Sequence, residues 1–512
     1  MYLGIEFGST RIKATVIDSN YITQKSSGYN WQSQYIDDVW TYDLQNAWTG
    51  LRSVLEGLGD LSSIEAVGIS GMMHGYLVFD KDWNLLAPFR TWQNMITGRA
   101  ADELTELFNF NIPQRWSIAH LYQAILNNEE HIDKIAHITT LAGYFHYMLT
   151  GRNVVGIGEA SGIFPVDSIN LGYDRQMLSK FDELLKLKKI RWTTTDVLPE
   201  ILLAGDKAGN LTEQGSNLID SLISPGVVFA PPEGDAGTGM VATNSVRVRT
   251  GNVSAGTSIF SMVVLDRPMK NLHREIDIIT TPDGRDVAMV HCNNCTRDSN
   301  EWINMLREMF DVFGYSVPDD ELYSKLYTKS LEGAADCAGI TVCNYIAGEN
   351  LTHMPGGIPM VIRQPDSKFT FAEFFRATLY SSMATMRIGM EILTGEKVSI
   401  DSLTGHGGLF KTPGVGQKYM AAACRTPIVC MESSGEGGPY GMAILASFTM
   451  QREENECLAD YLDSKVFKDT KTVRMEPDAA DVAGFDKYMR RYMKLLDVER
   501  KAVDIFSKEK QR

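Results

Sequence analysis

Two segments of the chain share one pattern: an apolar run, a short turn of small residues, and a second apolar run. In the first, residues 3–7 and 12–17 are predicted strands joined by the turn 8–10. In the second, within 246–265, the small residues 254–258 separate two apolar runs. Glycine lets the backbone turn tightly, and the amides and hydroxyls of such turns can bind phosphate oxygens. A single Gly-Ser-Thr turn is equally typical of an ordinary hairpin. Two copies about one domain apart favour a duplicated fold that binds phosphate from both sides.

Other segments have apolar residues at helical spacing. Helical patterns dominate residues 98–187, and further strands are predicted at 66–70, 76–79 and 227–230. A long helix is predicted at 371–394, where the methionines are expected to fill the core. An amphipathic helix is predicted at 43–58, with its apolar side made of Leu44, Trp48, Leu51, Val54 and Leu55.

Two glycine-rich segments follow the long helix. In 401–417 a strand end leads into a glycine turn that opens a helix, which would offer backbone amides to a nucleotide. In 432–446, Gly437, Gly438 and Gly441 would let a helix approach the preceding turn closely. The tail after residue 452 predicts a surface helix.

Length and charge exclude several classes of protein. A chain of 512 residues is too long for one core, so two large domains are expected. The net charge of -15 argues against a nucleic-acid or anionic-membrane partner, because both attract positive charge. Seven scattered cysteines and the lack of a long apolar run are typical of a reduced cytoplasmic protein.

Cys292 and Cys295 form a CxxC pair preceded by His291. A zinc site needs a second pair at similar spacing, and Cys337 with Cys343 is a poor match. We therefore interpret these cysteines as reduced residues near a strand end, and predict no metal site there.

Taken in order, these motifs resemble the FGGY family of carbohydrate kinases over residues 4–446. The resemblance implies an α/β, two-lobed, actin-like ATPase fold, which begins with a strand, a phosphate-binding hairpin and a strand. Within that family, the sequence is similar to the xylulose kinase group at residues 66–79, AVGISGMMHGYLVF, and in the LLAPFRTWQN that follows. The resemblance implies a first lobe at 1–245, a second at 246–450, and a helical extension at 451–512 packed on the second lobe.

The resemblance places the sugar site in the first lobe. Met73 and His74 would contact the sugar, since histidine can bind adjacent hydroxyls and methionine can pack on C–H groups. His74 could instead be a core histidine. Trp92 is as consistent with a pocket wall as with the core, and Asn94, like the neighbouring Gln93, offers an amide to hydroxyls.

Asp235, in PPEGDAGTG, is the candidate catalytic base. A strand running into Gly-Asp-Ala-Gly predicts a carboxylate on a loop where small neighbours admit a ligand. Sugar phosphorylation needs a base for the hydroxyl proton, and the family has an Asp in this role. The alternatives are an Asp that only forms a turn, or Glu233 as the base.

The resemblance also implies ATP and Mg²⁺, lying between the lobes. Glu6, where the family usually has Asp, would hold Mg²⁺ directly or through water. Two more departures, Met72 for a common Gln and Ala236 for a common Asn, remove polar groups near the sugar. Residues predicted to bind the nucleotide are Gly8, Ser9, Thr10, Lys13, Gly256, Thr257, Ser258, Gly407, Gly408 and Lys411, where Lys411 could also be a solvated charge.

The predicted function is ATP-dependent phosphorylation of a free sugar, most consistent with a ketopentose such as xylulose. Ribulose or another polyol is an alternative substrate. A second alternative is a nucleotide-binding module of the actin fold without enzymatic activity. Family habit also implies a terminal hydroxyl as acceptor and often a homodimer.

Overall fold

The computed structural model describes residues 1–431 and 437–506. These residues form two compact units. The first contains 1–248, 272–287 and 437–470, and the second contains 249–271, 288–431 and 471–506. The chain thus crosses between units more often than the expected contiguous lobes 1–245 and 246–450, because 272–287 and the helix after 437 belong to the first unit.

The first unit is built around strand β1 (Tyr2–Phe7), which pairs antiparallel with β2 (Arg11–Ile17) and parallel with β6 (Ala66–Gly71). The strand order is β13–β6–β1–β2–β3, and β14 also pairs with β6. Side chains alternate along β1. Leu3, Ile5 and Phe7 join the hydrophobic core with residues of α1 (Leu44–Leu58) and α4 (Leu141–Thr150). The remaining strands of this sheet are β3 (Thr23–Asn30), β13 (Val228–Phe229) and β14 (Glu233–Gly234).

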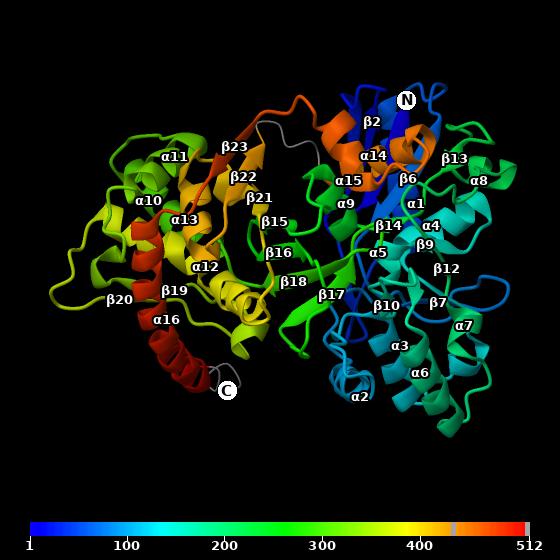
Figure 1. Ribbon diagram of the computed structural model, residues 1–512, viewed down its shortest axis with the longest axis horizontal. Helices are drawn as coiled ribbons and strands as arrows, with labels where there is room; N and C mark the ends of the chain where they lie inside the picture. The colour runs from blue at the N-terminus through cyan, green and yellow to red at the C-terminus, as the bar shows by residue number, and fades with distance from the viewer. Residues whose placement is uncertain (432–436, 507–512) are drawn as a thin grey trace. The chain divides into compact units, whose positions relative to one another are not determined.

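Helix α14 (Gly438–Gln451) packs on β1 and β6 (Figure 1). The approach is very close, since a Cβ on Gly4 would lie 2.0 Å from the carbonyl oxygen of Pro439. On α14 itself, a Cβ on Gly441 would lie 2.0 Å from the carbonyl oxygen of Thr238, in helix α9 (Asp235–Ala242). The glycines of 437–446 therefore permit close packing as predicted, while residues 432–436 of that motif lie outside the described residues.

The sheet of the second unit repeats the plan of the first. Strand β15 (Thr250–Ala255) is antiparallel to β16 (Ile259–Val264) and parallel to β21 (Ser402–His406), as β1 is to β2 and β6. The strand order continues as β18–β16–β15–β21–β22–β23. The duplicated fold predicted from the two hairpins is confirmed. The other strands are β18 (Asp286–Cys292), β22 (Ile428–Met431) and β23 (Thr472–Met475).

The predicted helices form where the apolar spacing places them. Helix α1 is capped by the Asp43 side chain, which accepts a hydrogen bond from the amide of Gln45. The long helix is α12 (Phe371–Gly395), and its Met383 and Met386 are fully buried, as expected of core residues. Among the helices of the described residues, none is long and apolar enough to cross a membrane. The other main helices are α2 (Gly98–Phe108), α3 (Ser117–Leu126), α6 (Arg175–Leu187), α10 (Arg297–Val312), α11 (Asp319–Ser330), α13 (Val415–Cys424) and α16 (Ala479–Phe506).

Shorter elements connect these helices and strands. The short helical segments are η1 (Ile132–Lys134), α5 (Ile157–Ala160), α7 (Thr194–Val197), α8 (Glu213–Leu218), η2 (Cys337–Gly339), η3 (Asn350–Thr352), η4 (Gly408–Phe410), α15 (Leu458–Tyr461) and η5 (Leu462–Val466). The short strands are β4 (Gln34–Ile36), β5 (Val39–Thr41), β7 (Leu77–Phe79), β8 (His137–Thr139), β9 (Val154–Gly156), β10 (Val166–Asp167), β11 (Gly172–Tyr173), β12 (Glu200–Leu202), β17 (Ile276–Thr280), β19 (Thr341–Cys343) and β20 (Met360–Ile362).

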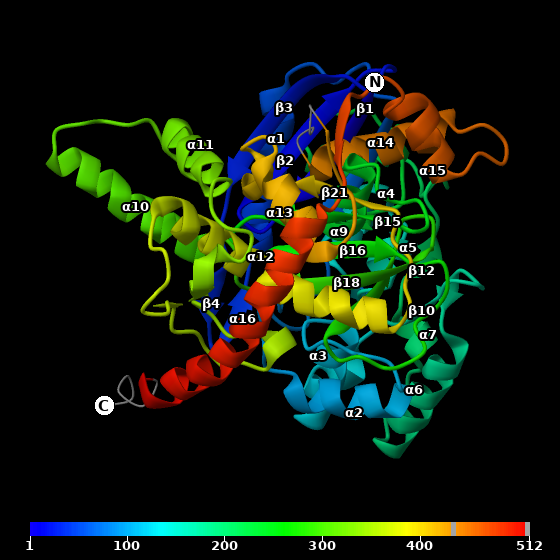
Figure 2. The same ribbon diagram turned by 60° about the vertical axis from the view of Figure 1, so that its left-hand side comes forward.

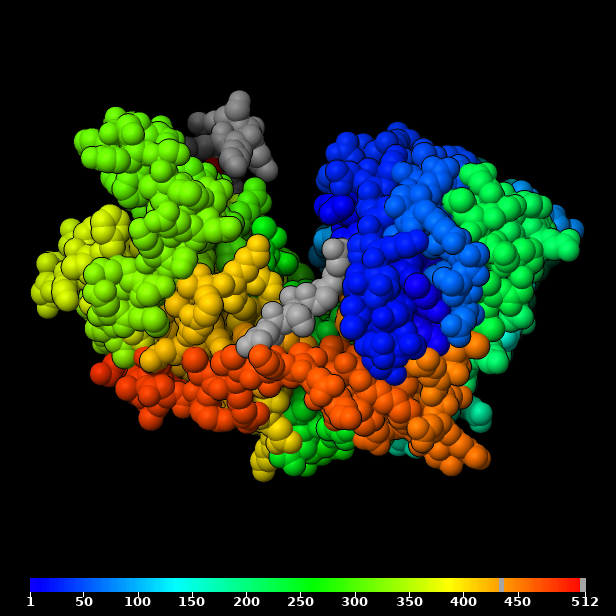
Figure 3. Space-filling model, turned by 90° about the horizontal axis from the view of Figure 1, so that it is seen from above, coloured from blue at the N-terminus to red at the C-terminus, as the bar shows by residue number. Residues whose placement is uncertain are grey.

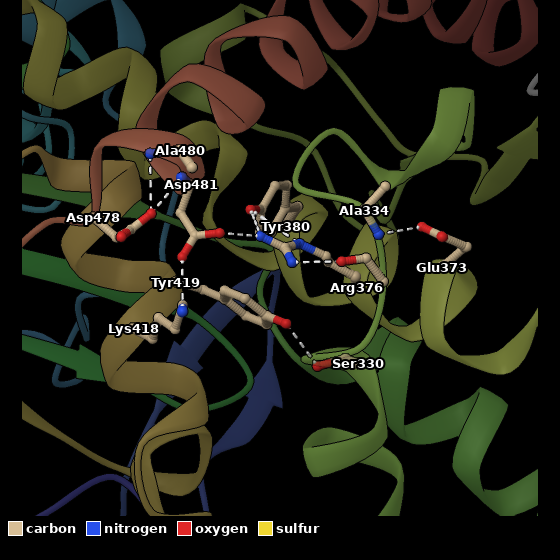
Figure 4. A network of polar contacts seen from close by, with 11 residues as sticks. Ser330, Ala334, Glu373, Arg376, Tyr380, Lys418, Tyr419, Asp478, Ala480 and Asp481 are labelled. Carbon is tan, nitrogen blue, oxygen red and sulfur yellow. Dashed lines mark hydrogen bonds and ion pairs between the residues drawn. The ribbon is translucent and has the colours of Figure 1, made fainter.

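Within the second unit, the C-terminal helix α16 runs along α12 and α13 (Figure 2). A buried ion pair joins Arg376 of α12 to Asp481 at the start of α16 (Figure 4). The guanidinium also lies over the rings of Tyr380 and Tyr419, at 5.2 and 4.9 Å. Lys418 reaches the second carboxylate oxygen of Asp481 at 3.2 Å. A charge this deeply buried is stable only while it is paired.

Removing one member of this pair should strongly destabilise the second unit. We expect Asp481→Asn to lower the free energy of unfolding by about 3 kcal/mol or more, because Arg376 keeps an uncompensated buried charge. The control is Glu332→Gln, which removes the exposed partner of Lys329 and should cost less than about 1 kcal/mol. Urea unfolding of both variants measures the difference. Equal effects would contradict the role given to the buried pair.

Candidate active site

The turn after β1 presents backbone amides on one side because hydrogen bonds hold its carbonyl groups on the opposite side. The indole N–H of Trp31 donates to the carbonyl of Gly8 at 2.7 Å, and the hydroxyl of Tyr42 donates to that of Ser9 at 2.6 Å. The carbonyl of Thr10 accepts from the backbone of Trp31 at 3.1 Å. In a trans peptide the C=O and the next N–H point in opposite directions. The amides of Ser9 and Thr10 therefore face away from the aromatic residues, as an anion-binding turn requires.

Glu6 lies at the end of β1, on the side of the strand that faces α14. Its side chain is almost fully buried and pairs with Lys13 of β2 at 3.3 Å. Burial raises the pKa of Glu6, and the charge of Lys13 acts against that shift. A Cβ on Gly438 would lie 2.2 Å from a carboxylate oxygen of Glu6. The lack of a side chain at position 438 therefore leaves room for the carboxylate at the N-terminus of α14.

The segment after β6 carries the two residues predicted to bind sugar. Met73 and His74 are both buried, and His74 has a φ of 72°, followed by Gly75 at 97°. A left-handed conformation is strained for histidine and is often found at functional sites. The imidazole stacks on Trp116, with 6.1 Å between ring centroids, and its Nδ1 lies 3.4 Å from the carbonyl of Gly162. The structure thus fixes the His74 ring in one orientation.

Asp235 is the first residue of helix α9, so the prediction that it lies on a loop is wrong. Strand β14 ends at Gly234, which has extended dihedral angles and caps the helix directly. A carboxylate at a helix N-terminus is favoured by the helix dipole. One oxygen of Asp235 accepts a hydrogen bond from the amide of Met73 at 3.2 Å. This bond brings the candidate base next to the segment predicted to hold the sugar.

The charge state of Asp235 is set by its surroundings. Burial and the nearby charge of Glu6 raise the pKa of Asp235, the Met73 amide lowers it, and together they give a pKa of about 6. Below neutral pH the carboxylate would begin to take up a proton. Near neutral pH it is ionised and able to accept one.

Glu233, the alternative base, is enclosed by protein. Its carboxylate accepts from the amides of Gly158 and Glu159 at 3.3 and 3.0 Å. A Cβ on Gly156 or Gly158 would lie 2.0 or 2.4 Å from its carboxylate oxygens. Burial raises the pKa of Glu233 to about 8. Glu233 therefore joins β14 to the start of α5, and its oxygens have no room for a substrate hydroxyl.

Two other residues predicted to contact the sugar differ from each other in exposure. The amide of Asn94 is buried and exchanges hydrogen bonds of 2.8 Å with both backbone groups of Trp40. It therefore fixes the loop to strand β5. Trp92 is 37% exposed, which excludes a core role, and its indole N–H donates to the hydroxyl of Ser9 at 3.2 Å. This bond brings Trp92 beside the turn predicted to bind phosphate.

The structure adds residues near Met73 and Asp235 that the sequence did not indicate. Glu159 is wholly buried, and a Cβ on Gly234 would lie 2.6 Å from one of its oxygens and 3.0 Å from Met73. Burial and the charges of Glu233 and Asp235 raise the pKa of Glu159 well above its usual range. Glu159 and Trp116 are far in sequence from the recognised motifs, so local pattern gave no signal for either.

The second hairpin turn lies in the second unit, between β15 and β16. The amide of Gly256 donates to the carbonyl of Ser258 at 2.9 Å, which closes the turn, and Thr257 is exposed. Gly407 has a φ of 98°, and a Cβ there would lie 2.5 Å from the carbonyl oxygen of Ala255. The glycine turn after β21 thus packs directly on the end of β15. This contact joins two predicted nucleotide-binding segments within one unit.

A cavity of about 650 Å³ opens in the second unit beside this turn. In Figure 3 the segments that form it, α10 and α11 in green and the region of residue 410 in amber, lie next to each other. Lys411 is exposed at its wall. The cavity is large enough for a nucleoside. Its lining is formed by Thr296, Asn300, Asp319, Asp320, Tyr323, Ser324, Tyr327, Gly408, Lys411 and Thr412.

The cysteines do not form a zinc site in the described part of the chain. Cys292 and Cys295 are buried free thiols, and burial raises the pKa of both. Among the described residues, no group of three or more His, Cys, Asp or Glu side chains could hold a metal. A magnesium ion bound together with phosphate groups needs less, because one or two carboxylates, phosphate oxygens and water hold it. Glu6 is a donor of that kind.

Comparison with known proteins defines the class. The N-terminal domain model of the FGGY family of carbohydrate kinases matches residues 1–229, and its C-terminal domain model matches residues 251–450. The chain belongs to this family and is an enzyme, a carbohydrate kinase with the actin-like ATPase fold.

Within the family, the chain is similar to xylulose kinases. It is 23% identical to the xylulose kinase of Haemophilus influenzae over 96% of this chain and 99% of that protein. Two solved structures from Lactobacillus acidophilus share the fold. A ligand-bound xylulose kinase has a TM-score of 0.79 at 16% identity, with 98% of each chain covered. A gluconate kinase has a TM-score of 0.78 at 15% identity, covering 98% of this chain and 97% of that one.

Substitution of Glu233 distinguishes its role from that of Asp235, the other acidic residue of PPEGDAGTG. We expect Glu233→Gln to lower the free energy of unfolding by about 1–3 kcal/mol, because one amide of α5 loses its acceptor. Its kcat should stay within about tenfold of wild type, since a lost general base costs at least about 10²-fold. Thermal unfolding and steady-state kinetics measure the two effects. A loss of activity without loss of stability would instead identify Glu233 as the base.

Proposed function

We propose that this carbohydrate kinase transfers the γ-phosphoryl group of ATP to a hydroxyl of a free ketopentose such as xylulose, with Asp235 as the general base. The observation that carries the proposal is the 3.2 Å hydrogen bond from the Met73 amide to Asp235. It joins the residue suited to accept a proton to the Met73-His74 segment on which the resemblance to xylulose kinases depends. The xylulose kinase relative of nearly equal length supports the choice of sugar.

In this proposal the sugar oxygen attacks the γ-phosphorus as its proton passes to Asp235. The bond from the γ-phosphorus to the bridging oxygen breaks, and ADP leaves. Little covalent work is required of the protein, so most of the rate enhancement comes from positioning and charge stabilisation. A carboxylate with a pKa of about 6 is ionised at neutral pH and is basic enough to take the proton.

The sugar would be bound by His74 and Met73, and Trp92 would form an exposed wall near the phosphate-binding turn. Asn94 would act indirectly, by fixing the loop to Trp40. Met72 stands where the family commonly has Gln. A methionine fits there because this side chain is buried in the hydrophobic core of the first unit. A polar residue is therefore not needed at position 72. Ala236 is partly exposed and leaves the sugar one polar partner fewer.

Each unit carries residues that would bind nucleotide. In the first unit, the amides of Ser9 and Thr10, with Lys13 nearby, would bind phosphate oxygens. In the second unit, the turn 256–258 would bind phosphate oxygens. The 650 Å³ cavity beside Gly408 and Lys411 would take the adenosine part.

Glu6 fits the role of magnesium ligand, because it is a carboxylate at the phosphate-binding end of β1. Its proximity to Asp235 is seen in the pKa of that residue, which the charge of Glu6 raises. Mg²⁺, when bound with ATP, would neutralise negative charge on the phosphate oxygens. Glu6 would hold it directly or through water, and Lys13 would limit the net charge at the site.

The proposal is tested by ADP release in the presence of ATP and a panel of ketoses, aldoses and polyols. We expect xylulose to stimulate ADP release above the basal rate, and Asp235→Asn to reduce the stimulated rate by at least about 10²-fold. The Asn side chain keeps the acceptor for the Met73 amide, so the local fold should persist.

The outcomes separate the parts of the proposal. Stimulation by another sugar alone would change the substrate and leave the kinase reaction standing. A near-wild-type rate for Asp235→Asn would remove Asp235 from the role of base. The absence of stimulation by any sugar would contradict the proposed reaction.

A further inference from the structure

The carbonyl groups of the second hairpin turn accept hydrogen bonds from one loop of the same unit, residues 293–296 before α10. The amide of Cys295 donates to the carbonyl of Thr257 at 3.0 Å. The amide and hydroxyl of Thr296 both donate to the carbonyl of Gly256, at 3.1 and 2.7 Å. Both central carbonyl groups of the turn are therefore fixed toward this loop.

This arrangement determines where the amides of the turn point. Because C=O and the next N–H are opposed in a trans peptide, the N–H groups of Thr257 and Ser258 face away from the loop. Two successive amides facing the same way form the concave anion site common to phosphate-binding turns. The loop thus orients the amides of Thr257 and Ser258, which belong to the turn and not to the loop. Thr296 also lines the 650 Å³ cavity, which places the loop beside the candidate nucleotide site.

The loop is itself fixed by a buried carboxylate, that of Glu349. One oxygen of Glu349, Oε2, accepts from the amides of Asn293 and Asn294 at 2.9 and 3.3 Å, and from the side chain of Asn294 at 3.1 Å. Glu349 is only 1% exposed. Bonds from N–H groups to a buried carboxylate are among the stronger hydrogen bonds in proteins.

Asn294 connects the same loop to the chain segment before Glu349. Its side-chain oxygen accepts from the amides of Ile346 and Ala347 at 2.9 and 3.0 Å, and its nitrogen donates to the carbonyl of Ala347 at 3.2 Å. The carbonyl of Cys295 accepts from the Asn344 side chain at 2.8 Å. The loop therefore has defined partners on both sides, the turn on one and the segment 344–349 on the other.

We propose that Glu349 is a positioning residue for nucleotide binding, acting through loop 293–296 on the amides of Thr257 and Ser258. The inference rests on the proposed role of the turn 256–258 in binding phosphate. Glu349 touches neither nucleotide nor sugar in this account. Its loss would misalign the phosphate donors and leave the sugar site of the first unit unchanged.

The test compares Glu349→Ala with Glu349→Gln. Only Oε2 receives the loop amides, so glutamine can place its carbonyl oxygen there while alanine leaves three N–H groups without an acceptor. We expect Glu349→Ala to raise the KM for ATP and the Kd for ADP, by calorimetry, at least about tenfold. The KM for the sugar should stay unchanged, and Glu349→Gln should restore ATP and ADP affinity to within about threefold of wild type.

Two further variants keep the test decisive if Glu349→Ala does not fold. Thr296→Val removes one hydrogen bond to the turn at nearly constant volume, and should weaken ADP binding severalfold without changing the KM for the sugar. Asp486→Asn is the control, because it disturbs the bonds of Asp486 to Arg387 and Arg425 elsewhere in the second unit. It should lower stability and leave ADP affinity at the wild-type value.

The outcomes distinguish this inference from the proposed function. ADP binding by Glu349→Ala and Thr296→Val equal to wild type would overturn the positioning role, as would equal losses in ATP and sugar affinity. Loss of ADP affinity in Asp486→Asn would also overturn it, since general destabilisation would then explain the effect. Failure of the wild-type protein itself to bind ADP would contradict the proposed function.

Discussion

The contact of α14 with β1 and α9 is the constraint on which the first unit depends. At Gly4 and Gly441 the backbones approach so closely that a single added carbon would lie 2.0 Å from a carbonyl oxygen. Through this contact, one helix fixes both the strand that leads into the turn 8–10 and the helix that begins with Asp235. Gly438 extends the contact to the carboxylate of Glu6. Helix packing thereby places two acidic residues from distant parts of the sequence.

The two turns proposed to bind phosphate are oriented in the same way by different residues. In each turn, hydrogen bonds hold the carbonyl groups on one side. Because C=O and the next N–H are opposed in a trans peptide, the amides then point to the opposite side. Aromatic residues, Trp31 and Tyr42, do this in the first unit. In the second unit, the loop fixed by Glu349 does it. A duplicated backbone can therefore preserve the orientation of its turn amides while the supporting residues diverge.

Local pattern predicted the elements that local forces determine. The strands around 8–10 and 254–258, the buried methionines of α12 and the duplicated fold followed from apolar spacing and turn chemistry. Interactions between distant segments could not be predicted this way. Tertiary packing encloses Glu233 among glycines of β9 and α5. It also determines that the Asn94 side chain forms hydrogen bonds with the backbone of Trp40. The crossing of residues 272–287 into the first unit has no local signal.

The role of Asp235 is the central claim, and the pH dependence of kcat/KM for the sugar tests it most directly. A base with a pKa of about 6 is active when ionised. The account predicts a plateau above pH 7 and a fall of roughly tenfold per pH unit below about pH 6, as one required carboxylate takes up a proton. A rate that stays constant from pH 7 down to pH 5, in protein that remains folded, would contradict the assignment.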